Sequence, residues 1–88
     1  MEYLMYSVKD ELTGKLMSPM FVEKSDIAEN EAIRQFRSNI NNIKLWKDNP
    51  SDFSLYLVGS FNDETGAAST AITKVISGRS VVNVSDEE

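Results

Sequence analysis

The chain has 88 residues, enough for one small domain with a single core, and it contains neither cysteine nor histidine. These two absences exclude a disulfide framework and a thiolate zinc site, and they remove the most frequent general base and the strongest nucleophile. The sequence also lacks a signal peptide, a long apolar segment and a glycine-rich phosphate loop, so we expect no cofactor, no membrane contact and a cytosolic location.

The first third of the chain predicts a β-hairpin. Tyr3 to Val8 alternates in the way of a half-buried strand, and Asp10 to Gly14 suits a tight turn, because Asp bonds its own backbone and Gly accepts positive φ. Leu16 to Val22 is a plausible second strand. Pro19 cannot donate a hydrogen bond to a neighbouring strand, so this strand is expected at an edge or with a bulge.

A helix is predicted from about Asp26 to Ile43. Asp26 and Glu29 have the spacing of a capping box, and Ser25 is a rival N-cap. Apolar residues then recur every three or four positions, as in a helix with one buried face. They are Ala28, Ala32, Ile33, Phe36, Ile40 and Ile43. The connector that follows, Lys44 to Pro50, is compatible with a further helical turn.

The last part of the chain predicts a second hairpin. Phe53 to Phe61 alternates clearly, with Phe61 expected on the same face as Phe53. Gly59 interrupts this strand, which indicates a bulge or a close approach by the helix. Asp63 to Gly66 resembles the first turn, and Ala68 to Ile76 is expected to return as a strand. We expect residues 1–78 to form the single domain and residues 79–88 to form an acidic, flexible tail.

The element order ββαββ predicts an α+β fold, in which one helix packs on one face of a four-stranded, mostly antiparallel sheet. One helix cannot cover both faces of such a sheet. The open face is expected to carry Tyr56, Val58 and one of Tyr3 and Tyr6. Apolar side chains on an open face usually have a partner, and a homodimer is favoured here over a surface for stacking nucleic-acid bases.

The charge distribution predicts one candidate binding site. The net charge of −5 argues against a polyanion partner, but residues 32–47 carry four cations and no acid. The cations would contact phosphates, and two aromatic residues are candidates for base stacking. The predicted nucleic-acid-binding residues are Arg34, Arg37, Lys44, Trp46, Lys47 and Tyr56. The alternative is structural, because charges opposite a buried helix face are usually solvated and a single Trp usually packs.

An enzyme is not expected. The clustered carboxylates lie in the two predicted turns, where they are explained as turn formers, and they lack the spacing of a calcium loop. A small hydrolase with paired carboxylates would need these acids to converge in a dry pocket.

Several segments resemble a known family. The segments are Tyr3 to Asp10 with Thr13-Gly14, Ala32 to Phe36, and Asn49 to Tyr56 with Gly59, Phe61 and Thr65-Gly66. In order and spacing they are similar to the small non-structural protein of gokushoviruses, which are single-stranded DNA bacteriophages of the Microviridae. Members of that family are commonly labelled DNA-binding proteins. The resemblance implies a role in genome replication or packaging in the bacterial host cytoplasm, without enzymatic activity, and it supplies no binding residues.

The sequence therefore predicts two alternative functions. The first is a dimeric phage protein that binds single-stranded DNA, or the replication and packaging machinery, through the basic segment. The second is a protein-interaction module that engages a viral or host protein, such as a replication or capsid protein, through its open sheet face or acidic tail without contacting DNA.

Overall fold

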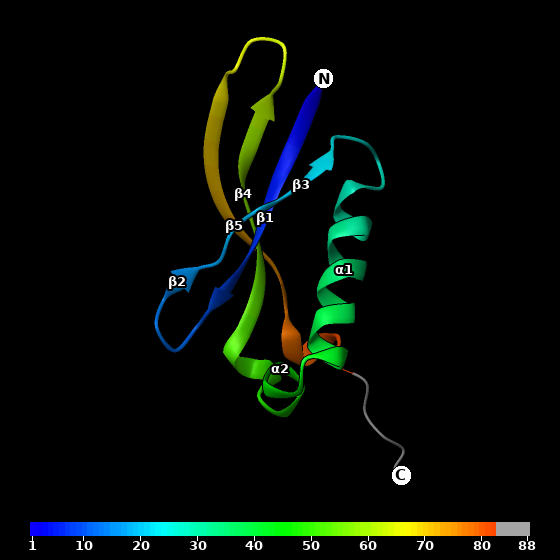
Figure 1. Cartoon of the computed structure of the whole chain (residues 1–88), viewed down its shortest axis with the longest axis vertical. Helices are drawn as coiled ribbons and strands as arrows, with labels where there is room; N and C mark the ends of the chain where they lie inside the picture. Colours follow the sequence, from blue (N-terminus) through cyan, green and yellow to red (C-terminus); the bar gives the residue numbers. More distant parts are fainter. Residues whose placement is uncertain (83–88) are drawn as a thin grey trace.

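The computed structural model describes residues 1–82, which form an α+β fold of 50 × 28 × 17 Å (Figure 1). The strands are β1 (Glu2–Asp10), β2 (Lys15–Leu16), β3 (Met20–Glu23), β4 (Phe53–Asn62) and β5 (Ala68–Ser77). The α-helices are α1 (Ala28–Asn42) and α2 (Lys44–Asp48), and two short 3₁₀ helices are η1 (Pro50–Asp52) and η2 (Gly78–Ser80).

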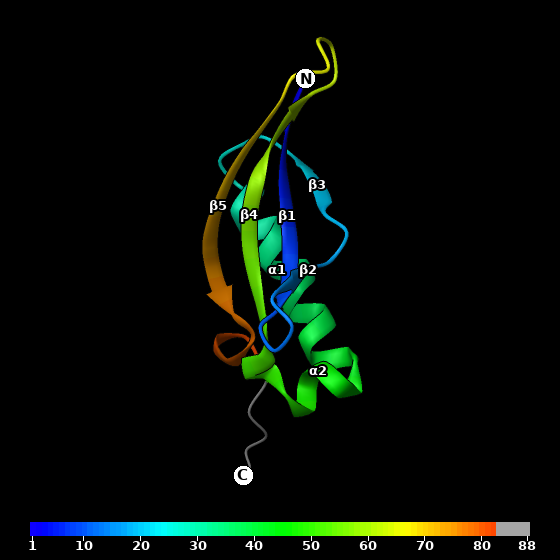
Figure 2. The same cartoon turned by 90° about the vertical axis from the view of Figure 1, so that its left-hand side faces the viewer.

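The five strands form one antiparallel sheet in which β1 and β4 are central. Strands β2 and β3 both pair with the same side of β1, and β5 pairs with the outer side of β4. Helix α1 covers one face of this sheet (Figure 2). The predicted ββαββ order and the single covering helix are confirmed, with the second predicted strand divided into two.

The division of the second strand occurs at Pro19, as the sequence indicates. Between β2 and β3 the chain leaves regular pairing, but it stays attached to β1 at Met17. The backbone N–H of Met17 donates to the Val8 carbonyl (2.8 Å), and the buried Ser7 hydroxyl donates to the Met17 carbonyl (2.5 Å). This edge of the sheet is therefore short and interrupted.

A bulge at Val58 changes the direction of the β4 side chains. Tyr6 of β1 pairs with Leu57 but Met5 pairs with Gly59, so Val58 is an extra residue in β4. Because side-chain direction alternates along a strand, one extra residue moves Phe61 to the open face. The expected bulge is confirmed, whereas the prediction that Phe61 shares a face with Phe53 is wrong.

Gly59 itself is required by β5 and not by the helix. A Cβ built on this residue would lie 2.0 Å from the Ser69 carbonyl oxygen, which is far inside any allowed contact. The backbone that approaches Gly59 therefore belongs to the neighbouring strand β5. The sequence pattern had suggested the helix as an alternative.

The core lies between α1 and the covered sheet face. It is formed by Tyr6, Val8, Ala32, Phe36, Ile40, Phe53, Leu55 and Val81. The predicted apolar positions of the helix are thus mostly correct. Ile43 is an exception, because it is 40% exposed and has an extended backbone that separates α1 from α2. Tyr6 faces the helix, and Tyr3 faces the opposite side. The prediction that one of these two tyrosines lies on the open face is therefore confirmed.

The start of α1 differs from the predicted capping box. The N-cap is Ile27, and neither Asp26 nor Glu29 makes a capping hydrogen bond. Ser25 supplies the local order instead: its hydroxyl accepts from the N–H of Ile27 (3.3 Å) and its carbonyl accepts from the N–H of Ala28 (3.2 Å).

The folded part of the chain extends beyond residue 78. Gly78 to Ser80 form η2, Val81 is buried in the core, and Val82 packs against it. Of the predicted tail, residues 79–82 therefore belong to the fold, and residues 83–88 lie outside the described residues.

Candidate nucleic-acid interface

The basic residues of α1 lie on its exposed side. Arg34 donates to Glu31 one turn earlier, at 2.8 Å, and this hydrogen bond holds the pKa of Glu31 below its ordinary value. Arg37 is exposed and makes no ion pair with any residue of 1–82. One of the two arginines is thus partly neutralised, and the other presents an uncompensated charge.

Helix α2 repeats this arrangement. Lys44 donates to Asp48 at 2.9 Å, and the hydrogen bond raises the pKa of the Lys44 ammonium. Lys47 is exposed and has no acidic partner in the described part of the chain. The predicted helical turn in the connector is confirmed, and it places the two lysines on an ordered element.

Trp46 packs within the protein. Its ring stacks on Phe53, with centroids 4.7 Å apart and an angle of 19° between the planes, and the side chain is half-buried against the core. The stacking joins α2 to the start of β4. The side chain proposed for stacking on a base thus already stacks on a protein ring.

Tyr56 lies on the open face of the sheet, opposite the face that α1 covers. Its hydroxyl donates to Glu11 (3.3 Å), and the Lys9 ammonium lies 5.2 Å from its ring centroid. Lys74, the partner of Tyr56 in β5, approaches the same Glu11 carboxylate at 3.9 Å. The structure does not bring Tyr56 together with the basic residues of α1 and α2.

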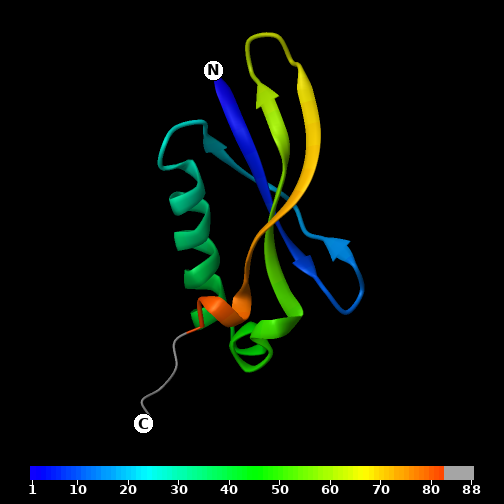
Figure 3. The same cartoon turned by 180° about the vertical axis from the view of Figure 1, so that it is seen from behind.

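Arg79 is a third exposed cation toward this end of the molecule, and Arg37, Lys47 and Arg79 together are called the basic surface. It lies in η2, beside the C-terminal end of α1, where the Asn41 amide donates to the Val81 carbonyl at 3.1 Å (Figure 3). Arg79 is exposed and has no acidic partner within residues 1–82. Sequence reasoning assigned Arg79 to the tail, although the apolar pair Val81-Val82 was a signal that the chain packs there.

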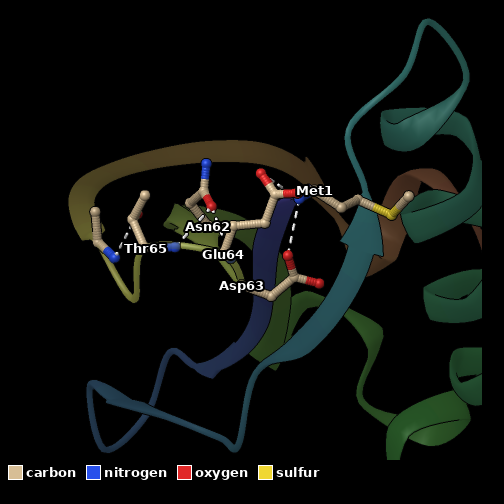
Figure 4. A network of polar contacts seen from close by, with 6 residues as sticks. Met1, Asn62, Asp63, Glu64 and Thr65 are labelled. Carbon is tan, nitrogen blue, oxygen red and sulfur yellow. Dashed lines mark hydrogen bonds and ion pairs between the residues drawn. The ribbon is translucent and has the colours of Figure 1, made fainter.

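The second acidic turn lies far from this surface. The turn of residues 63–66 is at the opposite end of the long axis from α2 (Figure 1). Figure 4 shows its polar contacts: the amine of Met1 donates to Asp63 (2.8 Å) and lies 3.7 Å from Glu64, and Asn62 accepts from the backbone of Glu64 (2.9 Å). These acids do not neutralise Arg37, Lys47 or Arg79.

The open face was predicted to carry Tyr3 or Tyr6, but the sequence did not predict that Phe21 and Phe61 join Tyr3 there. Tyr3, Phe21, Phe61 and Asp63 line a shallow hollow of about 340 Å³ on the open face, and Phe21 is 53% exposed. The rings of Phe21 and Phe61 meet edge to face at 6.1 Å. Gly59 was the sequence signal that could have predicted this position of Phe61, because the bulge beside Gly59 moves Phe61 to the open face.

The sequence of this chain matches one known protein family. No helix within residues 1–82 is long and apolar enough to cross a membrane, and no group of acidic side chains there is arranged to hold a metal ion. No curated protein and no solved structure matches the chain. The model of one family, described as Phage ORF5 protein, matches residues 3–86. Because this match spans nearly the whole sequence, the chain belongs to the Phage ORF5 protein family.

Proposed function

We propose that this phage protein binds single-stranded DNA, without enzymatic activity, during genome replication or packaging in the cytoplasm of the bacterial host. The proposal includes membership of the gokushovirus group that the sequence resembles. The observation that carries it is the separation of three cations from one acidic turn: Arg37, Lys47 and Arg79 are exposed and unpaired within residues 1–82, and the turn of residues 63–66 is at the other end. The first acidic turn lies at the same end as these cations, since the Glu11 N–H donates to the Asp52 carbonyl of η1 (2.8 Å).

The contact residues of the proposal follow from this separation. Arg37, Lys47 and Arg79 would contact phosphates directly, and Arg34 and Lys44 would do so after exchanging an intramolecular acid for a phosphate. Contacts of this kind give weak, sequence-independent binding that depends strongly on salt. Neither Trp46 nor Tyr56 is needed, because both have partners in the protein.

Fluorescence anisotropy with a labelled single-stranded oligonucleotide tests the proposal. With three phosphate contacts, the logarithm of the binding constant should fall with the logarithm of salt concentration with a slope of about −2. Lys47→Ala should reduce the slope by about 0.7, as expected for the loss of one contact with single-stranded DNA. Lys15→Ala is the matched control, since Lys15 is exposed on β2 and also unpaired within residues 1–82.

The absence of binding at low salt would contradict the proposal. Equal weakening by Lys47→Ala and Lys15→Ala would also contradict it, because binding would then follow overall charge and not this surface.

A second candidate function is supported by the hollow on the open face. Exposed aromatic rings are typical of protein interfaces, and the acidic rim formed by Asp63 is unfavourable for phosphate. Under this alternative the protein binds a phage replication or capsid protein through Tyr3, Phe21 and Phe61. Cosedimentation with each purified partner, lost in Phe21→Ser and retained in Lys47→Ala, would support the alternative over DNA binding.

A further inference from the structure

The two edges of the sheet differ in how well they are protected against pairing with another strand. The edge beside β1 consists of β2 and β3, which have two and four residues and are separated by Pro19. Short strands and proline are features that natural proteins use to block pairing at an edge. The opposite edge is β5, which has ten residues and no proline.

Strand β5 presents its outer edge without cover. No other strand of residues 1–82 pairs with that side, and β5 runs along the outside of the sheet (Figure 2). All residues from Ala68 to Lys74 are exposed, and Ile72 is 67% exposed. An exposed edge of this length and composition is a template for antiparallel pairing.

The charges of β5 favour a second copy of the same chain as the partner. Lys74 is its single charged residue, in a protein whose net charge is −5. In an antiparallel pairing that a two-fold axis centres on Ile72, Lys74 of each copy faces Thr70 of the other, so no like charges meet. The strand carries no acid that would attract a basic partner or repel its own copy.

The centre of the pairing follows from the side chains. A two-fold axis normal to the sheet keeps each side chain on its own side, and facing residues of antiparallel strands point to the same side. The axis therefore lies midway between two copies of one residue. Ile72 is the most exposed large apolar side chain of β5, and this centre buries it against the Ile72 of the second copy. We propose that the protein forms a homodimer through β5, with the two strands antiparallel and centred on Ile72.

This arrangement has a consequence for the rest of the molecule. A two-fold axis normal to the sheet leaves both α1 helices on the same face of one continuous ten-stranded sheet, twice the five strands of one copy. The two basic surfaces would then lie on the same side, and the open faces with their aromatic hollows would form the other side. The dimer does not depend on DNA binding, so either proposal can fail without the other.

Cysteine crosslinking tests the dimer directly, because the natural chain has no cysteine. Ile72→Cys places two thiols opposite each other at the two-fold axis, at the Cα separation that a disulfide accepts. We expect most of the protein to become covalent dimer under mild oxidation at tens of micromolar. Phe21→Cys, exposed on the open face, and Leu12→Cys, exposed in the first turn, are the controls and should crosslink little.

A second variant tests the same interface without oxidation. Ile72→Lys brings two charges together at the axis, and light scattering should then report a mass half that of the natural protein, while Leu12→Lys should retain the dimer. Both positions are exposed in the single chain, so folding should be unchanged in circular dichroism spectra. A monomeric natural protein would overturn the proposal. Crosslinking of Phe21→Cys equal to or greater than that of Ile72→Cys would overturn it as well.

Discussion

Trp46 and Phe53 stack with their ring centroids 4.7 Å apart and their planes 19° from parallel. The contact fixes α2 against the first residue of β4, and it therefore determines where Lys44 and Lys47 lie relative to the sheet. Trp46 therefore has a structural role: it holds the helix that carries Lys47 in place. The stacking also explains how a helix of five residues stays ordered.

Trp46→Ala should lower the free energy of unfolding by about 3 kcal/mol, since a half-buried ring and its stacking partner lose their contact. Trp46→Phe, which keeps an aromatic ring, should lower it by about 1 kcal/mol. Urea titration followed by circular dichroism measures both. If Trp46→Ala unfolds at the same urea concentration as the natural protein, the stacking does not stabilise the fold.

Gly59→Ala should lower the free energy of unfolding by about 3 kcal/mol, because the new methyl group would overlap the Ser69 carbonyl. Gly66→Ala is the control: its added Cβ meets no atom within 4 Å, but its φ of +76° disfavours any side chain, by about 1 kcal/mol. Gly59 also has a positive φ, of +156°, so in thermal unfolding the loss of Gly59→Ala beyond that of Gly66→Ala measures the steric overlap. Equal losses would mean that β5 moves away from Gly59 easily.

The Glu31–Arg34 pair should give stability a dependence on acid pH. The hydrogen bond from Arg34 lowers the pKa of Glu31, so the folded state holds this carboxyl ionised more strongly than the unfolded state does. The contribution is present above the ordinary value of 4.5 and is lost as the pH falls through the lowered pKa. NMR titration of the Glu31 carboxyl should show the pKa rising in Arg34→Ala and unchanged in Arg37→Ala.

Tyr6 should make the stability of the fold depend on pH in the alkaline range. Burial, and then the charge of Glu29, raise the pKa of Tyr6 above 10.0, because both disfavour the phenolate. The raised pKa of the folded state means that this stability is present below 10.0 and is lost as the pH rises through the higher value.

Tyr6→Phe should remove that alkaline loss. The Tyr6 hydroxyl makes no hydrogen bond within residues 1–82, so the substitution should change stability by less than about 1 kcal/mol at neutral pH. Tyr3→Phe, which removes the same group from the open face, is the control. Chemical denaturation across the alkaline range distinguishes the two, and identical pH profiles would rule out a role for Tyr6.

Asp48→Asn should strengthen the proposed binding to single-stranded DNA. The substitution releases Lys44 from its 2.9 Å ion pair and removes one negative charge beside Lys47. One additional phosphate contact would make the salt slope steeper by about 0.7. Asp26→Asn removes an equal charge from the segment before α1 and should change the slope less. Equal effects would mean that only net charge matters.

Much of the fold could be predicted because alternation and helical spacing are local properties. The β1 faces, most of the buried side of α1, the interruption at Pro19 and the bulge beside Gly59 all follow from residues close in sequence. The strand order could not be predicted, since it depends on pairing between distant segments. The predicted face of Phe61 was wrong for a related reason. The pattern located a bulge, but it did not show which residue is the extra one.

The candidate site was harder to predict than the fold. The sequence placed Arg37 and Lys47 correctly on exposed sides, because charge opposite an apolar stripe faces solvent. It could not reveal that Trp46 stacks on Phe53 or that Tyr56 lies on the other side of the sheet. Both facts depend on which segments meet in space, and so does the addition of Arg79.

The extra residue in β4 has a further consequence. Because Val58 has no counterpart in β1, the same alternating series supplies the core before it and the aromatic hollow after it. If β4 instead paired with β1 without a bulge, Val58 would face Met5 and Phe61 would face Glu2, so Phe61 would turn to the side that α1 covers. The hollow on the open face therefore depends on one bulge, and it would be absent in a relative whose β4 has the same aromatic residues but pairs with β1 without a bulge.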